Sequence, residues 1–201
     1  MRSLLVVLGI ALVALPAAAQ AALGPNPAND PRLIDDPIEE YRYDYAERCV
    51  DQPKDGTVSM TRWMDRHLRG ELWGTVRCSS LGSGWSVHSE GRAIDWRLDA
   101  GITSEKRSAM RFIDMLLATD DRGRRHALAR RMGVQGVIFN CKSWWSGQSE
   151  LGRYSYCYDS NGNLCDDLDR TQAHRDHVHV ELNWPGARER TSFWRSPLAD
   201  E

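Results

Sequence analysis

The sequence predicts an α+β domain with a small, mostly antiparallel sheet and flanking helices. Stretches with apolar residues at helical spacing come first in the folded region, and short β-branched runs lie between and after them. This irregular succession favours an α+β arrangement over a parallel α/β sheet. The chain has 201 residues, of which 41% are hydrophobic and 27% charged, so its length and composition suit one globular domain with its own core.

The folded domain is expected over 46–198, after a Pro-rich segment, 22–45, that predicts a linker or an arm lying on the domain. Helices are expected over 58–69, 104–117 and 124–132. Thr57 and Ser104 are the expected caps of the first two helices, and Gly133 is expected to end the third. Strands are expected over 72–78, 134–139 and 177–182.

Residues 1–21 are expected to be a signal peptide that is removed on export. Arg2 precedes an apolar run over 4–15, and the alanines that follow fit cleavage after Ala21, with cleavage after Ala19 as the alternative. The apolar run is too short for a comfortable membrane span. We therefore expect a secreted, extracellular protein without a membrane span after cleavage.

The net charge argues against one class of partner, and the cysteines predict disulfide bridges. A net charge of −2 argues against nucleic acid as a partner, since such binding domains usually carry a basic excess. Five cysteines in an exported chain predict disulfides, and two bridges leave one thiol free. Proximity favours one bridge within the set Cys141, Cys157 and Cys165, which leaves Cys49–Cys78 as the other, although the sequence leaves further pairings open.

Two segments, 85–96 and 174–181, carry the residues that indicate chemistry. In the second, His177 and His179 alternate with valines on an expected strand, so both imidazoles lie on one face and the valines on the other. Imidazoles side by side suit metal binding or acid–base chemistry. A catalytic zinc site needs three protein ligands and an open position, so a further ligand must come from elsewhere.

The first segment can supply that ligand. His88 and Asp95 are seven residues apart and cannot share a face of one straight strand, but Gly91 between them allows a sharp turn. His88 then lies before the turn, and Asp95 lies on the strand that leaves it, beside the small Ala93. The expected ligands of Zn²⁺ are His88, Asp95 and His179, with water in the fourth position.

The same residues carry a resemblance to a known group of enzymes. The pattern S-x-H-x-x-G-x-A-x-D is met at Ser86, His88, Gly91, Ala93 and Asp95, and the later H-x-H at His177 and His179. Together they are similar to the motifs of zinc D-alanyl-D-alanine carboxypeptidases, whose fold is shared by murein endopeptidases, lysostaphin-type peptidases and the hedgehog signalling domain. Over 45–194 the chain also resembles a group of secreted actinobacterial proteins. The resemblance implies a hedgehog/DD-peptidase-like fold and the same three zinc ligands.

The resemblance leaves the general base open. Relatives carry either an acidic residue three positions before the last ligand, here Asp176, or histidines five and two positions before it, here His174 and His177. Strand alternation favours His177, because Asp176 points away unless the strand begins at His177. His174 is then a residue of the cleft, and Asp176 is the alternate base or orients a ligand imidazole from behind.

Other residues have weaker expected roles. Arg77 is expected to contact an oxyanion or a substrate carboxylate, or else to be a surface residue beside a disulfide. Ser86 is expected to hydrogen-bond the substrate or to close the turn, and Glu181 to be structural. A groove-lining role in an irregular stretch is expected for the aromatic residues Trp144, Trp145, Tyr154 and Tyr156.

The predicted function is that of a zinc metallopeptidase, a hydrolase of the cell wall that cleaves peptidoglycan stem peptides. It acts as a D,D-carboxypeptidase or as an endopeptidase. The first alternative is a wall-binding or signalling module of the same fold that keeps its zinc for stability. The second is a disulfide-stapled wall protein whose histidines bind nothing.

Overall fold

The computed structural model describes residues 24–78, 80–81 and 84–201, so the expected signal peptide, 1–21, lies outside the described residues. The strands are β1 (Glu71–Gly74), β2 (Ser80–Leu81), β3 (Gly84–Trp85), β4 (Ala93–Arg97), β5 (Val134–Phe139), β6 (Lys142–Trp145), β7 (Gly152–Arg153) and β8 (His177–Leu182). The helices are α1 (Asp55–His67), α2 (Thr103–Leu117), α3 (Ala127–Met132), α4 (Trp184–Ala187) and α5 (Ser192–Arg195), with short 3₁₀ turns η1 (Pro27–Asn29), η2 (Val87–Glu90), η3 (Ser155–Cys157) and η4 (Pro197–Ala199).

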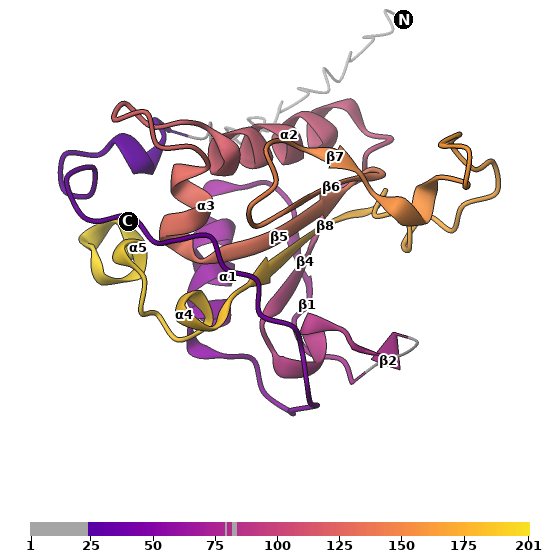
Figure 1. Cartoon of the computed structure of the whole chain (residues 1–201), viewed down its shortest axis with the longest axis horizontal. Coiled ribbons are helices and arrows are strands. Elements are labelled where there is room, and N and C mark those ends of the chain that lie inside the picture. Colours follow the sequence, from indigo (N-terminus) through magenta and orange to yellow (C-terminus); the bar gives the residue numbers. More distant parts are fainter. Residues whose placement is uncertain (1–23, 79, 82–83) are drawn as a thin grey trace, which may run out of the picture.

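An antiparallel sheet of six strands forms the centre of the fold, in the order β1-β4-β8-β5-β6-β7 (Figure 1). A separate two-stranded hairpin, β2 with β3, stands beside it. Helices flank the sheet, so the expected α+β class with an antiparallel sheet is confirmed. None of the helices in the described part of the chain combines the length and the hydropathy of a membrane-spanning segment.

The apolar core lies between one face of the sheet and the helices α1, α2 and α3. Val178 and Val180 of β8 are fully buried there, against apolar residues of the helices that include Met64 and Phe112. In α1 and α2 the buried apolar residues recur at helical spacing, as the sequence predicts. The predicted alternation along β8 is therefore confirmed, because the valines face this core and the histidines face away from it.

Several predicted helix boundaries and caps were wrong. Helix α1 begins at Asp55, three residues early, and Thr57 lies inside it with its hydroxyl donating to Gly91 O at 2.8 Å. Helix α2 begins at Thr103, so Ser104 is not its cap. Helix α3 begins only at Ala127, because the chain before it forms a turn around the Asp120 carboxylate. Gly133 ends α3 with a φ of 74°, as predicted.

The sheet also differs from the sequence-based prediction at two places. Strand β1 ends at Gly74 after a register shift, so the chain over 75–78, which we expected to be strand, leaves the sheet. Strand β6 was expected to be irregular. It pairs with β5 because Asn140 and Cys141, with φ of 48° and 61°, form a tight hairpin turn. Strands β5 and β8 have the predicted bounds.

The segment expected to be a linker or an arm is an arm that lies on the domain. In Figure 1 it runs, in indigo, along the outside of the fold beside α3 and α5. Ala28 and Leu33 are fully buried in the main core, and the guanidinium of the fully buried Arg131 donates to Asp36 O at 3.0 Å. The arm therefore contributes buried residues to the core of the domain.

The disulfide prediction is confirmed. Cys49 pairs with Cys78, and Cys141 pairs with Cys157, which leaves Cys165 free. The first bridge joins the chain just after the arm to the segment 75–78 that leaves the sheet. The two bridges are consistent with an extracellular protein.

Candidate metal centre

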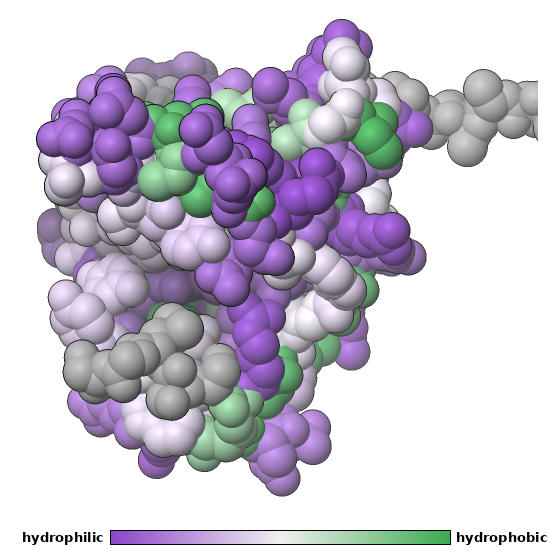
Figure 2. Space-filling view, turned by 90° about the vertical axis from the view of Figure 1, so that its right-hand side faces the viewer, coloured by the Kyte–Doolittle hydropathy of each residue, from purple (hydrophilic) through white to green (hydrophobic). Residues whose placement is uncertain are grey.

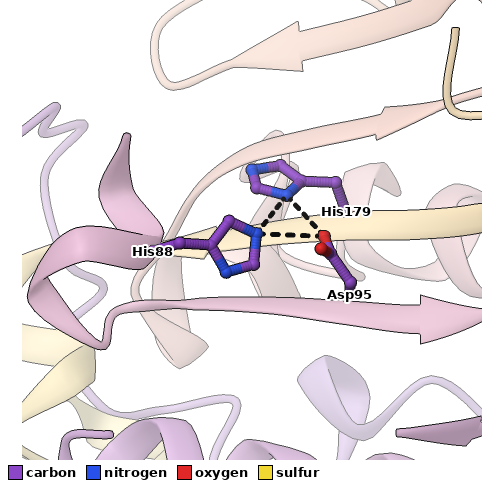
Figure 3. Close-up of side chains that lie close together, drawn as sticks. All are labelled: His88, Asp95 and His179. Carbon is purple, nitrogen blue, oxygen red and sulfur yellow. Dashed lines mark hydrogen bonds and ion pairs between the residues drawn. The ribbon is translucent and has the colours of Figure 1, made fainter. Parts of the chain in front are cut away.

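The three predicted ligands converge on one point (Figure 3). Strands β4 and β8 pair so that Asp95 lies opposite His179, and η2 brings His88 to the same place. Asp95 Oδ1 lies 3.0 Å from His88 Nε2 and 2.9 Å from His179 Nδ1, and these two nitrogens are 3.1 Å apart. All three side chains are at least 95% buried.

The local sequence explains how His88 reaches the strands. The Ser86 side chain caps η2 by accepting a hydrogen bond from His88 N at 3.4 Å, so Ser86 closes this turn. Gly91 follows with a φ of 65°, and a Cβ there would lie 2.4 Å from Gln52 O. Because only glycine suits both the left-handed backbone and the close approach, Gly91 turns the chain from η2 into β4. The predicted sharp turn is confirmed.

The donor set fits a divalent metal ion. Ligand atoms of tetrahedral zinc lie at about 2.0–2.1 Å from the ion and so about 3.3 Å from one another. The three separations here, 2.9–3.1 Å, need only a small outward movement to reach that geometry. Two imidazole nitrogens and one carboxylate oxygen are also the donor types of catalytic zinc sites. The group His88, Asp95 and His179 can therefore hold a metal ion.

In each of the two histidines of the triad, an oxygen atom contacts the ring nitrogen that faces away from the candidate metal position. His88 Nδ1 lies 3.0 Å from Thr75 O, and His179 Nε2 lies 3.1 Å from Glu181 Oε1. Such contacts select the ring tautomer and direct the other nitrogen at the metal. Sequence reasoning missed both residues. Glu181, expected to be structural, had a signal, because it lies two positions after His179 on the same strand face, whereas nothing in the sequence indicates Thr75.

The electrostatics of the group explain how it stays buried. Burial alone would raise the pKa of Asp95, but the nearby His177 imidazole and the hydrogen bonds from His179 and His88 hold this pKa far below its usual value. Burial likewise opposes protonation of His179, yet its hydrogen bonds to Asp95 and Glu181 outweigh burial and raise its pKa to about 9. Burial lowers the pKa of His88. The pair of carboxylates therefore stabilises positive charge at this point, whether a proton or a metal ion carries it.

His177 has the geometry of an acid–base residue. Its Nε2 lies 3.4 Å from Asp95 Oδ1, and this buried nitrogen has no hydrogen-bond partner among the described residues. Its Nδ1 lies 2.8 Å from Asp176 Oδ1. Because β8 begins at His177, Asp176 precedes the strand and its carboxylate turns toward the imidazole. The two candidate bases thus form a pair, in which His177 faces the ligands and Asp176 holds His177.

The remaining predicted site residues lie around this pair. The ring centroid of His174 is 4.7 Å from that of His177, and burial lowers the pKa of His174 to about 2. Arg77 forms an ion pair with Asp95 Oδ2 while 53% of its side chain stays exposed. Arg77 and Thr75 belong to the segment that leaves the sheet after β1. That departure from the predicted strand therefore supplies two contacts to the ligands.

The approach to the site is partly aromatic. The half-exposed Trp73 packs edge-on against His177, with ring centroids 5.4 Å apart. A pocket of about 650 Å³ lies beside this contact, and its lining includes Trp73, Ile102 and Asp176. Figure 2 shows this side of the molecule as hollowed, with hydrophilic residues inside the hollow. Of the aromatic residues expected to line a groove, Tyr154 packs edge-on against His174, with ring centroids 5.1 Å apart, whereas Trp144 is wholly buried in the core.

Comparison with known proteins adds no relative to this description. No family model, no curated protein and no solved structure matches the chain. The function of the protein is therefore inferred from the geometry of the centre and from the motif resemblance.

Proposed function

We propose that the protein is a secreted zinc-dependent peptidase that cleaves peptidoglycan stem peptides, as a D,D-carboxypeptidase or an endopeptidase. Its fold would then be the hedgehog/DD-peptidase-like arrangement that the motifs imply. The observation that carries the proposal is the convergence of His88, Asp95 and His179 beside His177 Nε2, a buried nitrogen that makes no hydrogen bond within the described part of the chain. A ligand triad with an adjacent acid–base group is the arrangement that hydrolytic zinc enzymes need.

Each residue of the centre has a chemical task in this proposal. A Zn²⁺ ion held by three protein ligands polarises a carbonyl and makes water a strong nucleophile near neutral pH. His177 accepts a proton from the attacking water at Nε2, because the Asp176 carboxylate keeps the other ring proton on Nδ1. His177 then donates that proton to the departing amine. The half-exposed guanidinium of Arg77 suits an oxyanion or a peptide carboxylate.

A non-catalytic zinc module is the alternative that one observation favours. The ligands are almost wholly buried and join η2, β4 and β8, so a bound ion would also stabilise the fold. Such a module would hold zinc without needing His177. His177 Nε2 makes no hydrogen bond to any residue that the structure describes, and this favours the enzyme, because a buried polar atom without a hydrogen bond destabilises the fold and so indicates a functional use.

The test is mass spectrometry of muropeptides digested by zinc-loaded protein, with and without a chelator. We expect release of D-alanine or division of cross-links by the wild type. We expect none from His179→Ala, and at least about 10²-fold slower turnover with zinc retained in His177→Gln. Identical products from the wild type and His179→Ala would remove the enzyme proposal. Bound zinc without turnover in the wild type would establish the non-catalytic module.

A further inference from the structure

The N-terminal arm reaches the metal centre through one hydroxyl group. Tyr43 donates a hydrogen bond to Glu181 Oε2 at 3.2 Å, and the other oxygen of that carboxylate, Oε1, lies 3.1 Å from His179 Nε2. The opposite nitrogen of His179, Nδ1, is the ligand atom. A continuous chain of contacts therefore runs from the arm, through the carboxylate and the imidazole, to the place of the cation.

We propose that Tyr43 is a positioning residue of the metal centre and that the arm thereby sets the affinity for the metal ion. The inference rests on the metal centre of the proposed function, and it does not require peptidase turnover. It gives the described part of the arm, 24–45, a role in the function in addition to its role in the core.

The Glu181 carboxylate depends on few donors. Only 6% of the residue is exposed, so its oxygens need partners within the protein. Oε2 accepts hydrogen bonds from Tyr43 and from Gln135 Nε2, each at 3.2 Å. Gly136 leaves the space for this carboxylate, because a Cβ there would lie 3.2 Å from Oε2 and 2.5 Å from the Trp145 ring. Tyr43 therefore supplies one of the two hydrogen bonds that Oε2 accepts from the residues that the structure describes.

The arm is held firmly at this point. The Gln135 side chain accepts from Asp44 N at 2.9 Å and donates to Asp44 O at 3.1 Å, while it also donates to Glu181. The Arg92 guanidinium donates to Asp44 O at 3.0 Å. The Tyr43 ring packs edge-on against Trp145, with centroids 5.9 Å apart. Because one amide group binds both the arm and the carboxylate, ordering of the arm and ordering of Glu181 are coupled.

The effect on the metal ion follows from the role of Glu181. A fixed carboxylate behind a ligand imidazole sets its ring orientation and increases its basicity, and loss of such outer partners weakens metal binding by roughly 10–100-fold. Without the Tyr43 hydroxyl, Oε2 keeps only the Gln135 contact, and the carboxylate can rotate away from His179. For loss of the Tyr43 hydroxyl we expect metal affinity to fall about tenfold, the lower end of that range, because Tyr43 acts one contact further from the ion than Glu181 does.

The experiment compares two arm tyrosines in the full-length mature protein. Tyr43→Phe removes the hydroxyl that donates a hydrogen bond to Glu181. The matched control, Tyr41→Phe, removes a hydroxyl that lies 2.9 Å from His126 Nδ1, away from the centre. Zn²⁺ affinity is measured by competition with a chromophoric chelator, and the ligand field by the visible absorption of Co²⁺-loaded protein. We expect Tyr43→Phe alone to weaken Zn²⁺ binding about tenfold and to shift the Co²⁺ spectrum.

A double-mutant cycle with Glu181→Gln tests whether Tyr43 acts through the carboxylate. In the Glu181→Gln background, Tyr43→Phe should have a smaller effect on Zn²⁺ affinity than in the wild type, since coupled residues are not additive. Unchanged affinity and an unchanged Co²⁺ spectrum in Tyr43→Phe would overturn the proposal, and so would an equal loss in Tyr41→Phe. If those results came with intact muropeptide cleavage, the proposed function would stand. A wild type that binds no Zn²⁺ would remove both.

Discussion

The two faces of strand β8 are equally buried and chemically opposite. Val178 and Val180 face helices across an apolar core, while His177 and His179 face the metal centre, and all four are at most 4% exposed. The valine face is stabilised by burial that has no direction and that other apolar residues of similar size would provide. The histidine face is held by hydrogen bonds and ion pairs to particular atoms of distant segments.

This difference assigns the valine face to the stability of the fold and, under the proposed function, the histidine face to metal binding. Burying a Val side chain contributes about 1.5–3 kcal/mol, whereas burying a polar group is unfavourable unless every hydrogen bond is made. On the histidine face, His177 Nε2 makes no hydrogen bond to the described residues, although it lies 3.4 Å from Asp95 Oδ1. Mutations on the valine face should therefore change the free energy of unfolding, and mutations on the histidine face should change metal binding.

The largest expected effect is on metal binding by His179→Ala. Removal of one of three ligands from a structural or catalytic zinc site should lower Zn²⁺ affinity by about 10³-fold or more. Metal content after equilibrium dialysis checks this directly. Retention of one equivalent of Zn²⁺ with wild-type affinity would show that the histidine face does not form the site.

Val180→Ala is the matched variant on the other face of the same strand. Val180 is fully buried in the main core, so its truncation should lower the free energy of unfolding by about 2–3 kcal/mol. Urea unfolding of the metal-free protein measures this loss. Zn²⁺ affinity of the folded variant should stay within about threefold of the wild type, and a loss as large as that of His179→Ala would break the distinction between the faces.

The Cys49–Cys78 bridge should affect the metal centre more than the other bridge does. Cys78 adjoins Arg77, which pairs with Asp95, and Thr75, which orients His88. The double variant Cys49→Ala/Cys78→Ala should therefore weaken Zn²⁺ binding by about tenfold, as loss of outer partners does.

The control for this prediction is Cys141→Ala/Cys157→Ala. That bridge lies in a small separate cluster with Ala173. Its removal should lower the unfolding free energy by about 2–4 kcal/mol with little change in Zn²⁺ affinity. Equal effects of the two pairs on Zn²⁺ affinity would contradict the prediction. Chelator competition gives both affinities.

The smallest expected effect concerns a buried polar group outside the site. Burial would raise the pKa of Asp120, but hydrogen bonds from Arg124 outweigh it and lower this pKa. Because the folded-state pKa is depressed, the stabilisation is present above the ordinary value of about 3.8 and is lost as pH falls through the folded-state value. Asp120→Asn should lower the unfolding free energy at pH 7 by about 1–2 kcal/mol.

Thermal unfolding between pH 2 and pH 7 checks that expectation. The difference in stability between the wild type and Asp120→Asn should shrink as pH falls below about 4. Zn²⁺ affinity at pH 7 should be unchanged, since Asp120 contacts its own turn and not the centre. A constant difference at every pH would show that the carboxylate charge is not what stabilises the turn.

The residues alone predicted the features that depend on local spacing and composition. Alternation along 177–182 placed His177 and His179 on one face, and Gly91 between His88 and Asp95 allowed the turn that the structure contains. Periodicity also located the helices α1 and α2 and the strand β8, and an apolar, β-branched run located β5. Such patterns are visible in sequence because burial of one face repeats every two or every 3.6 residues.

The atoms from distant segments that complete the candidate metal centre could be identified only from the packing of the folded chain. Glu181 and Tyr43 are 138 positions apart, and Thr75 contacts His88 through a backbone carbonyl that any residue possesses. The start of α1 likewise depended on a contact between Thr57 and Gly91. Hydrogen bonds between segments far apart in the chain depend on strand register and packing, which leave no periodic trace in the residues that make them.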